Sequence, residues 1–86
     1  MKLVFTDPAK KELKDLPQEL AVQFIAHLEK MLDMPPRKHM KYGIPYHVEK
    51  VTKQGRIICD IREDKIYIIH CFGSHNEYER WYKSYK

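Results

Sequence analysis

The segment RIICDIREDKIYIIHCF, residues 56–72, contains two apolar runs separated by a short polar reversal. Isoleucine, tyrosine and phenylalanine are enriched in β-strands, and the polar pair Glu63-Asp64 lies where a tight turn would join two strands. The pattern therefore predicts a β-hairpin made of strands 56–62 and 65–72. We place the other expected elements around this hairpin.

Two further strands are expected, one on each side of a helical region. Tyr46 to Val51 alternates between apolar and polar residues and leads through the turn-like Lys53-Gln54-Gly55 into the hairpin. Lys2 to Thr6 is short, apolar and β-prone, which predicts a first strand. The polar and aromatic tail, Asn76 to Tyr85, fits a short closing helix.

The region between the first strand and the meander predicts two helices. Thr6-Asp7-Pro8 supplies capping side chains followed by a proline at the first helical position. Pro17 separates two helices and Pro35-Pro36 ends the second, because proline disfavours a helical residue before it. Two apolar stripes recur at helical spacing: Ala9, Leu13 and Leu16, then Leu20, Phe24, Ile25, Leu28, Met31 and Leu32.

Together these elements predict an α+β fold. It has an N-terminal strand, an antiparallel helical hairpin packed on one face of a mainly antiparallel four-stranded sheet, and a short C-terminal helix. A chain of 86 residues can bury about 60–65% of its unfolded surface, which is enough for one core. We therefore expect residues 1–86 to form a single domain.

Composition narrows the class of partner and compartment. The chain carries 16 Lys and Arg against 12 Asp and Glu, a net charge of +4, which weakly favours a polyanionic partner. No apolar stretch approaches the roughly 20 residues that span a bilayer, and no secretory segment opens the chain, so we expect a cytoplasmic protein without membrane association. Cys59 and Cys71 lie in apolar strands; a disulfide is possible, but buried reduced thiols are favoured.

Strand alternation sorts the polar side chains by face. A two-residue turn at Glu63-Asp64 would pair Ile57 with His70, with His70 on the core face. That core face would carry Ile57, Cys59, Ile61, Ile66, Ile68 and Phe72, and the opposite face Arg56, Ile58, Asp60, Tyr67, Ile69 and Cys71. Extending the same parity across the preceding turn adds two residues to the non-core face, so that its polar set is His47, Glu49, Arg56 and Asp60. A one-residue bulge would break this register.

This polar set, with His75 just beyond the last strand, suits cleavage of an RNA phosphodiester. A base takes the proton of the 2′-hydroxyl, an acid protonates the leaving 5′-oxygen, and a guanidinium stabilises charge on the phosphorane. We assign His75 as the acid and Arg56 as the phosphate ligand. The base is either His47 or Glu49, and Asp60, expected opposite His47, would orient its ring. The mechanism needs no metal or cofactor, and none is expected; the alternative is a merely polar, solvated sheet face.

Aromatic and basic residues beside this set are candidates for RNA contacts, because unstacked bases stack on aromatic rings and lysines pair with phosphates. Trp81 is expected instead to cover the edge of the core. The basic loop 37–43 is either a phosphate-contacting segment or a solvated connection. The candidate RNA-contacting residues are Lys38, Lys41, Lys50, Lys53, Tyr78 and Tyr82.

Three motifs, Tyr46-His47-Val48-Glu49, Gly55-Arg56-Ile57-Ile58 and Gly73-Ser74-His75-Asn76-Glu77, resemble the RelE/ParE superfamily of bacterial and archaeal toxins. The chain is most similar to its RelE- and YafQ-like messenger-RNA interferases, over nearly its whole length. The resemblance implies a toxin that cleaves messenger RNA, usually in the A site of the 30S ribosomal subunit, and that a cognate antitoxin neutralises.

The resemblance also implies roles for individual residues. His75 matches the catalytic histidine, His47 a strand position held by histidine or lysine, and Arg56 the strand arginine of the RelE type. Glu49 departs from the lysine of RelE-type chains, and Val51 departs from an aspartate of YafQ-type chains. The alternatives are a ParE-like inhibitor of DNA gyrase, which shares the fold, and a non-catalytic module that binds RNA or an antitoxin.

Overall fold

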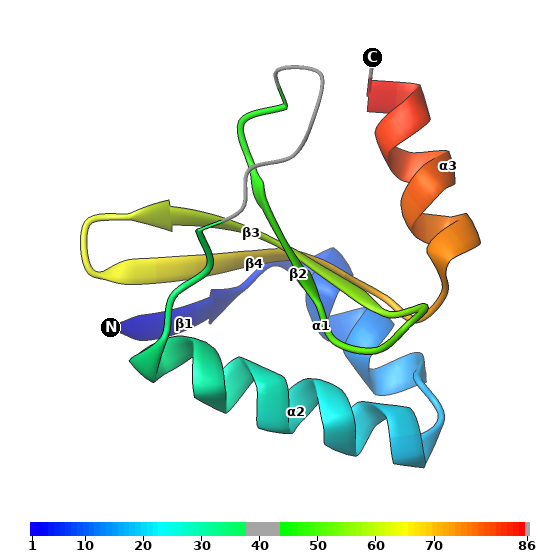
Figure 1. The fold of residues 1–86 in the computed structure, drawn as a ribbon, viewed down its shortest axis with the longest axis horizontal. Helices are drawn as coiled ribbons and strands as arrows, with labels where there is room; N and C mark the ends of the chain where they lie inside the picture. Colours follow the sequence, from blue (N-terminus) through cyan, green and yellow to red (C-terminus); the bar gives the residue numbers. More distant parts are fainter. Residues whose placement is uncertain (38–43, 86) are drawn as a thin grey trace.

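The computed structural model describes residues 1–37 and 44–85, and it has two helices on one face of a four-stranded sheet and a third helix on the other (Figure 1). The sheet order is β1-β4-β3-β2, with β1 parallel to β4 and the other pairs antiparallel. The predicted α+β fold is confirmed. The elements are β1 (Lys2–Phe5), α1 (Asp7–Asp15), α2 (Gln18–Asp33), β2 (His47–Lys50), β3 (Arg56–Arg62), β4 (Lys65–Phe72) and α3 (His75–Tyr85).

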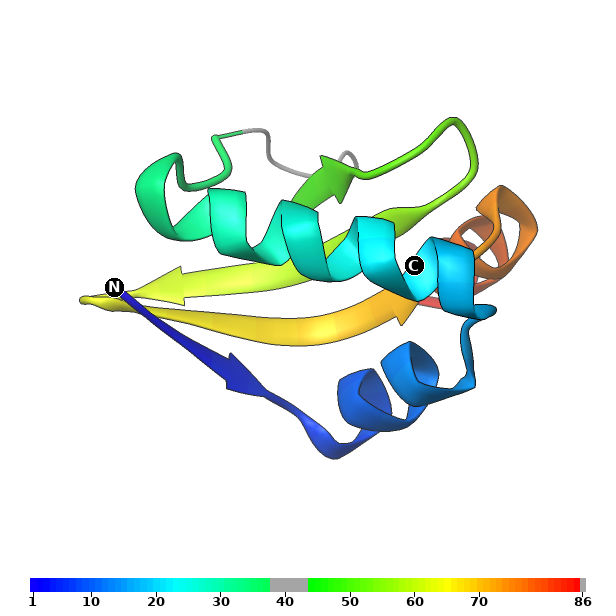
Figure 2. The same ribbon diagram turned by 90° about the horizontal axis from the view of Figure 1, so that it is seen from below.

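The helical pair covers one face of the sheet and encloses the main core. α1 and α2 run in opposite directions across that face, as seen from the α2 side in Figure 2. Thr6 caps α1 by accepting a hydrogen bond from the Ala9 amide at 3.2 Å, as its sequence predicts. The main core consists of Ala9, Phe24, Leu28, Met31, Ile57, Cys59, Ile66, Ile68 and Cys71.

α3 covers the opposite face, where the sequence predicted an open polar surface. Apolar side chains of β2, β3 and β4 form a second, smaller cluster there, and aromatic side chains of α3 pack on it. Trp81, which was expected to cover the edge of the core, packs against this second cluster. The second cluster consists of Ile44, Val48, Ile58 and Phe72, with Tyr46, Ile69, Tyr78, Trp81 and Tyr82 against it.

A β-bulge in the hairpin changes the predicted faces of the last residues of β4. Cys59 pairs with Ile68 as expected, but Ile58 then pairs with His70, so Ile69 is an extra residue. One extra residue reverses the alternation beyond it. The predicted pairing of Ile57 with His70 and the faces of His70, Cys71 and Phe72 are therefore wrong: Cys71 lies in the main core, and His70 and Phe72 lie towards α3.

The register of β2 also differs from the prediction by one residue. Lys50 pairs with Arg56, which places Glu49 opposite Ile57 and His47 opposite Cys59. The loop between β2 and β3 has an odd number of residues, which shifts the pairing by one. Thr52 stabilises this loop, because its side-chain oxygen accepts hydrogen bonds from the amides of Gln54 at 3.2 Å and Gly55 at 2.8 Å. The prediction that His47 and Glu49 share a face with Arg56 and Asp60 is consequently wrong.

Both cysteines are free and buried, with relative exposures of 0% for Cys59 and 1% for Cys71. Burial raises the pKa of each thiol to about 12, and the carboxylates of Glu49 and Glu12 add to the effect at Cys59 and Cys71 respectively. The thiols therefore stay protonated at neutral pH. No helix within the described residues is long and apolar enough to cross a membrane.

Alkylation of Cys59 and Cys71 is expected to be slow in the folded protein and fast in denaturant, because only the thiolate reacts. Their pKa values rise from 9.0 in the unfolded chain to about 12 on folding, so the thiols contribute stability below pH 9.0 that is lost as the pH rises towards 12. Thiol titration and urea unfolding measure both effects. Fast labelling of the native chain would contradict this account. So would a loss of stability at high pH in Cys59→Ala or Cys71→Ala that is as large as the loss in the wild type.

Candidate active site

The candidate site begins at the capped N-terminus of α3. The Glu77 amide donates to Ser74 Oγ at 3.3 Å, and the Ser74 amide donates back to Glu77 Oε2 at 3.3 Å. This reciprocal pair is a capping box, which starts the helix at His75. The Ser-x-x-Glu spacing of Ser74 and Glu77 is typical of a capping box. Sequence reasoning interpreted this segment only as a catalytic motif.

His75 lies where α3 meets the turn between β2 and β3. Its backbone amide donates to Gln54 Oε1 of that turn at 3.3 Å, and its ring meets the Tyr78 ring edge-on at 5.7 Å between centroids. Nδ1 of the ring lies 2.7 Å from Glu79 Oε1, one helical turn further on. Sequence reasoning did not select Glu79, although its i,i+4 spacing from His75 was the available signal.

Arg56 opens β3 on the same side of the sheet. Its Nη1 donates to the carbonyls of Thr52 and Lys53, each at 3.2 Å, and of Gly55 at 3.0 Å. The guanidinium carbon lies 5.8 Å from the centroid of the Tyr78 ring, within range of a cation–π contact. The bonds to the turn and the contact with Tyr78 together hold the arginine beside α3.

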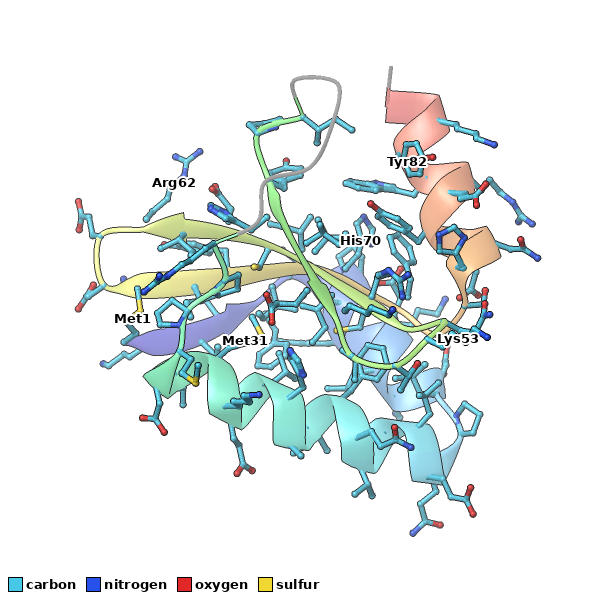
Figure 3. All side chains as sticks on the ribbon, viewed as in Figure 1. Met1, Met31, Lys53, Arg62, His70 and Tyr82 are labelled. Carbon is cyan, nitrogen blue, oxygen red and sulfur yellow. The ribbon has the colours of Figure 1, made fainter. Side chains whose placement is uncertain are left out.

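Two tyrosines continue this surface along α3. The rings of Tyr78 and Tyr82 lie 5.1 Å apart between centroids. The pKa of Tyr78 is raised, first by burial and then by Tyr82, while Arg56 opposes the rise, so Tyr78 is a neutral phenol at physiological pH. Lys50 is exposed and is the strand partner of Arg56. Lys53 is exposed in the turn between β2 and β3 (Figure 3). We call His75, Arg56, Tyr78, Tyr82 and Lys50 the α3 corner.

His47 and Glu49 do not belong to the α3 corner. They lie on the α2 face of β2, where Glu49 Oε1 lies 2.8 Å from His27 Nε2. Glu49 is 25% exposed and His27 is 19% exposed, so they form a half-buried imidazole–carboxylate pair. A contact between α2 and a strand 22 residues away leaves no local sequence signal.

Asp60 also has a different neighbour from the one expected. Its carboxylate accepts a hydrogen bond from Arg62 Nε at 2.8 Å. Asp60 pairs with Tyr67 across β3 and β4, whereas His47 pairs with Cys59. Because adjacent strand residues point to opposite faces, the expected orienting contact between Asp60 and His47 is wrong.

His70 has a structural environment under α3. Its Nδ1 lies 3.0 and 3.1 Å from the two carboxylate oxygens of Glu12, and its ring stacks on Phe72 at 4.8 Å and meets Trp81 edge-on at 5.2 Å. Glu12 Oε1 also accepts the Cys71 amide at 3.0 Å, beyond the end of β1. His70 is thus a hydrogen-bonded, half-buried imidazole on the face opposite to the one predicted.

Two of the predicted RNA-contacting residues, Lys38 and Lys41, lie outside the described residues. Within the described chain, no group of three histidine, cysteine or acidic side chains is placed to hold a metal ion. The structure thus brings His75 and Arg56 together, through Tyr78, and separates them from His47 and Glu49. The chemistry of the α3 corner is that of an imidazole beside a guanidinium and two phenol rings that pack at a tilt.

No known protein family matches this sequence, and no curated protein matches it either. Solved structures do match. The isolated Escherichia coli RelE toxin is 17% identical with a TM-score of 0.69, covering 94% of this chain and 95% of its own. The RelB–RelE antitoxin–toxin complex of Methanococcus jannaschii contains a chain that is 14% identical with a TM-score of 0.71, covering 91% and 96%.

A third similar structure is the YoeB/ParE toxin from Agrobacterium tumefaciens, 15% identical with a TM-score of 0.68 over 83% of this chain and 95% of that one. At such identities the similarity shows the fold. The chain has the fold of these RelE and YoeB/ParE toxin structures, which is the fold that the motif resemblance implied.

Proposed function

We propose that this chain is the toxin of a toxin–antitoxin pair and that it acts as a metal-independent endoribonuclease on messenger RNA. The observation that carries the proposal is the α3 corner, where His75, Arg56 and Tyr78 meet in the fold of RelE and YoeB toxins. The resemblance of Gly73-Ser74-His75 to the end of YafQ-type chains, which carries their catalytic histidine, supports the role of His75. The proposed substrate is messenger RNA in the A site of the 30S subunit.

In the proposed mechanism the 2′-hydroxyl attacks the adjacent phosphorus and releases its proton to solvent water, and the bond from the phosphorus to the 5′-oxygen breaks. His75 donates the proton to the leaving oxygen, a transfer that an imidazole performs well near neutral pH. Arg56 binds the phosphate and stabilises the charge of the phosphorane through the part of its guanidinium that the turn does not occupy. Placement of the 2′-hydroxyl in line with the scissile bond supplies further acceleration.

The remaining residues of the α3 corner hold the RNA together with Lys53. Tyr78 and Tyr82 offer ring faces on which bases stack, and the exposed Lys50 and Lys53 contact phosphates along the strand. The proposal gives His47 and Glu49 no role as the base, because they lie on the opposite face of β2 from Lys50 and Arg56.

The proposed partners are a cognate antitoxin and the ribosome, in the cytoplasm. The antitoxin assignment is supported by the M. jannaschii structure, which is an antitoxin–toxin complex, and by the intact E. coli RelBE toxin–antitoxin complex, 18% identical with a TM-score of 0.70. The net charge of +4 favours a polyanionic substrate.

Purified translation followed by primer extension tests the proposal. Wild-type chain added to ribosomes translating a defined message is expected to produce discrete cuts, and the same message without ribosomes is the paired sample. A supercoiling assay with purified gyrase runs in parallel. Intact message with inhibited gyrase would replace this function with a ParE-like one, and no effect in either assay would indicate a non-catalytic module.

Replacing Arg56 by alanine is expected to slow cleavage about 100-fold, because one donor to a developing oxyanion is lost. The free energy of unfolding should fall by about 1–2 kcal/mol, since three hydrogen bonds to turn carbonyls also disappear. Cleavage rate and urea unfolding measure the two effects. Arg56→Lys keeps the charge without the planar fork and should recover only part of the rate.

Arg62→Ala is the matched control for Arg56. It removes an arginine from the other end of the same strand, where the side chain is 75% exposed and bonded to Asp60 (Figure 3). Cleavage should be unchanged in this variant. Equal rate losses in both arginine variants would point to a general charge effect and contradict the assigned contact of Arg56 with the scissile phosphate.

A further inference from the structure

The turn between β2 and β3 is held in place by hydrogen bonds within it and by the core. Thr52 Oγ1 accepts hydrogen bonds from the amides of Gln54 at 3.2 Å and Gly55 at 2.8 Å. The Val51 amide donates to the Gly55 carbonyl at 3.1 Å. Gly55 is buried, and a Cβ added there would lie 2.9 Å from Cε1 of the core residue Phe24. The side chain of Gln54 therefore extends from a backbone that is held on both sides.

Gln54 reaches from this turn to the first residue of α3. Its side chain lies at the surface, and its Oε1 accepts a hydrogen bond from the His75 amide at 3.3 Å. The first four amides of an α-helix have no acceptor within the helix, so the His75 amide needs one from elsewhere. The bond joins residues 21 positions apart in the sequence, and it ties the backbone of the proposed acid to the turn that precedes Arg56.

The same turn also holds the guanidinium of Arg56. Two of the three carbonyls that accept hydrogen bonds from Arg56 Nη1 belong to the residues immediately before and after Gln54. At α3, the Tyr78 ring lies 5.7 Å from the His75 ring and 5.8 Å from the guanidinium carbon of Arg56. The contacts thus form a closed circuit in which Gln54 links the turn to α3.

Capping of α3 alone does not account for this link. Ser74 and Glu77 already form a reciprocal capping box, in which the side chain of each accepts the amide of the other. An acceptor on the turn adds a constraint that a local cap does not. It fixes the distance between the start of α3 and the start of β3, where His75 and Arg56 lie.

We propose that Gln54 is a positioning residue that sets the separation of His75 from Arg56. It acts through the backbone of His75, so that the imidazole and the guanidinium meet the same phosphodiester. The reaction needs the acid at the leaving 5′-oxygen and the guanidinium at the phosphate oxygens, and a displacement of about 1 Å can slow a reaction about 100-fold. The inference rests on the proposed ribonuclease function for its catalytic consequence, whereas the hydrogen bond is a property of the folded chain without RNA.

The test combines hydrogen exchange, measured by NMR, with cleavage kinetics on the full chain. In Gln54→Ala the His75 amide should exchange about 3- to 10-fold faster than in the wild type, the factor that one net hydrogen bond is worth. Its kcat should fall about 10- to 100-fold with KM changed by less than about twofold, because the RNA-contacting groups remain. Gln54→Glu keeps an acceptor oxygen at the same reach, so it should restore the slow exchange and part of kcat. Gln54→Asn is one methylene shorter and should behave as Gln54→Ala does.

Gln23→Ala is the matched control, because it removes an exposed glutamine side chain from α2 and should alter neither readout. Unchanged exchange of the His75 amide in Gln54→Ala would overturn the inference, and so would a wild-type kcat in that variant. A raised KM with an unchanged kcat would make Gln54 an RNA contact and would also overturn it. Failure of the proposed function has a different signature: the wild-type chain would leave the message intact, while exchange of the His75 amide would still respond to Gln54→Ala.

Discussion

His75→Ala is expected to reduce the rate of message cleavage by at least about 100-fold, because loss of a general acid costs about 10²–10⁴ in rate. The side chain is 39% exposed on the first turn of α3, and its ion-pair contact with Glu79 contributes little to stability. The fold should therefore survive. Single-turnover cleavage on programmed ribosomes and a thermal unfolding curve measure the two quantities in the same preparation.

Asn76→Ala is the control for this substitution, since it truncates the next residue of the same helical turn, which is exposed. It should cleave at the wild-type rate. His75→Gln keeps the size of the side chain and a hydrogen-bonding group but cannot transfer a proton, so it should be as slow as His75→Ala. Wild-type cleavage in both His75 variants would place the acid elsewhere in the chain.

The periodic elements were predictable from sequence because their signals are local. Thr6 and Pro17 delimit α1, and the apolar stripe of α2 is regular, so both helices lie where expected. The Glu63-Asp64 reversal likewise fixed the pairing of Ile61 with Ile66. At Glu63 the backbone has a φ of 55°, which a short turn requires.

The faces of the strands were not predictable, because single residues decide them. The extra residue at Ile69 reverses the faces of the last residues of β4, and the odd number of residues in the loop before β3 reverses the faces of β2. Neither feature interrupts the apolar pattern of the sequence around it. The site was affected in the same way: alternation grouped Arg56 with Glu49, whereas the contact of Glu49 with His27 depends on tertiary packing. For the same reason, alternation did not predict the second apolar cluster, which α3 covers.

Phe24→Ala is expected to lower the free energy of unfolding by about 3–5 kcal/mol, the range for truncating a fully buried phenylalanine. The ring is 0% exposed in the middle of α2 and packs in the main core. A domain of this size has a total stability of about 5–15 kcal/mol, so much of it would be lost. Urea unfolding followed by circular dichroism measures the change.

Val22→Ala, in the same helix but 60% exposed, is the control and should change stability by less than about 0.5 kcal/mol. A loss below about 1 kcal/mol in Phe24→Ala would mean that the ring is not part of the core, since even small core truncations cost that much.

The ring of Phe24 also ties the core to the α3 corner. A Cβ added at Gly55 would lie 2.9 Å from Phe24 Cε1 and 3.1 Å from Thr52 Oγ1. Gly55→Ala should therefore destabilise the wild type more than it destabilises Phe24→Ala, where only the Thr52 contact remains close. This double-mutant cycle measures the coupling directly. Additive losses would show that Phe24 does not restrict the turn that precedes Arg56. A coupling between the two substitutions would show that this buried phenylalanine packs against the turn beside the arginine that we propose to bind the phosphate.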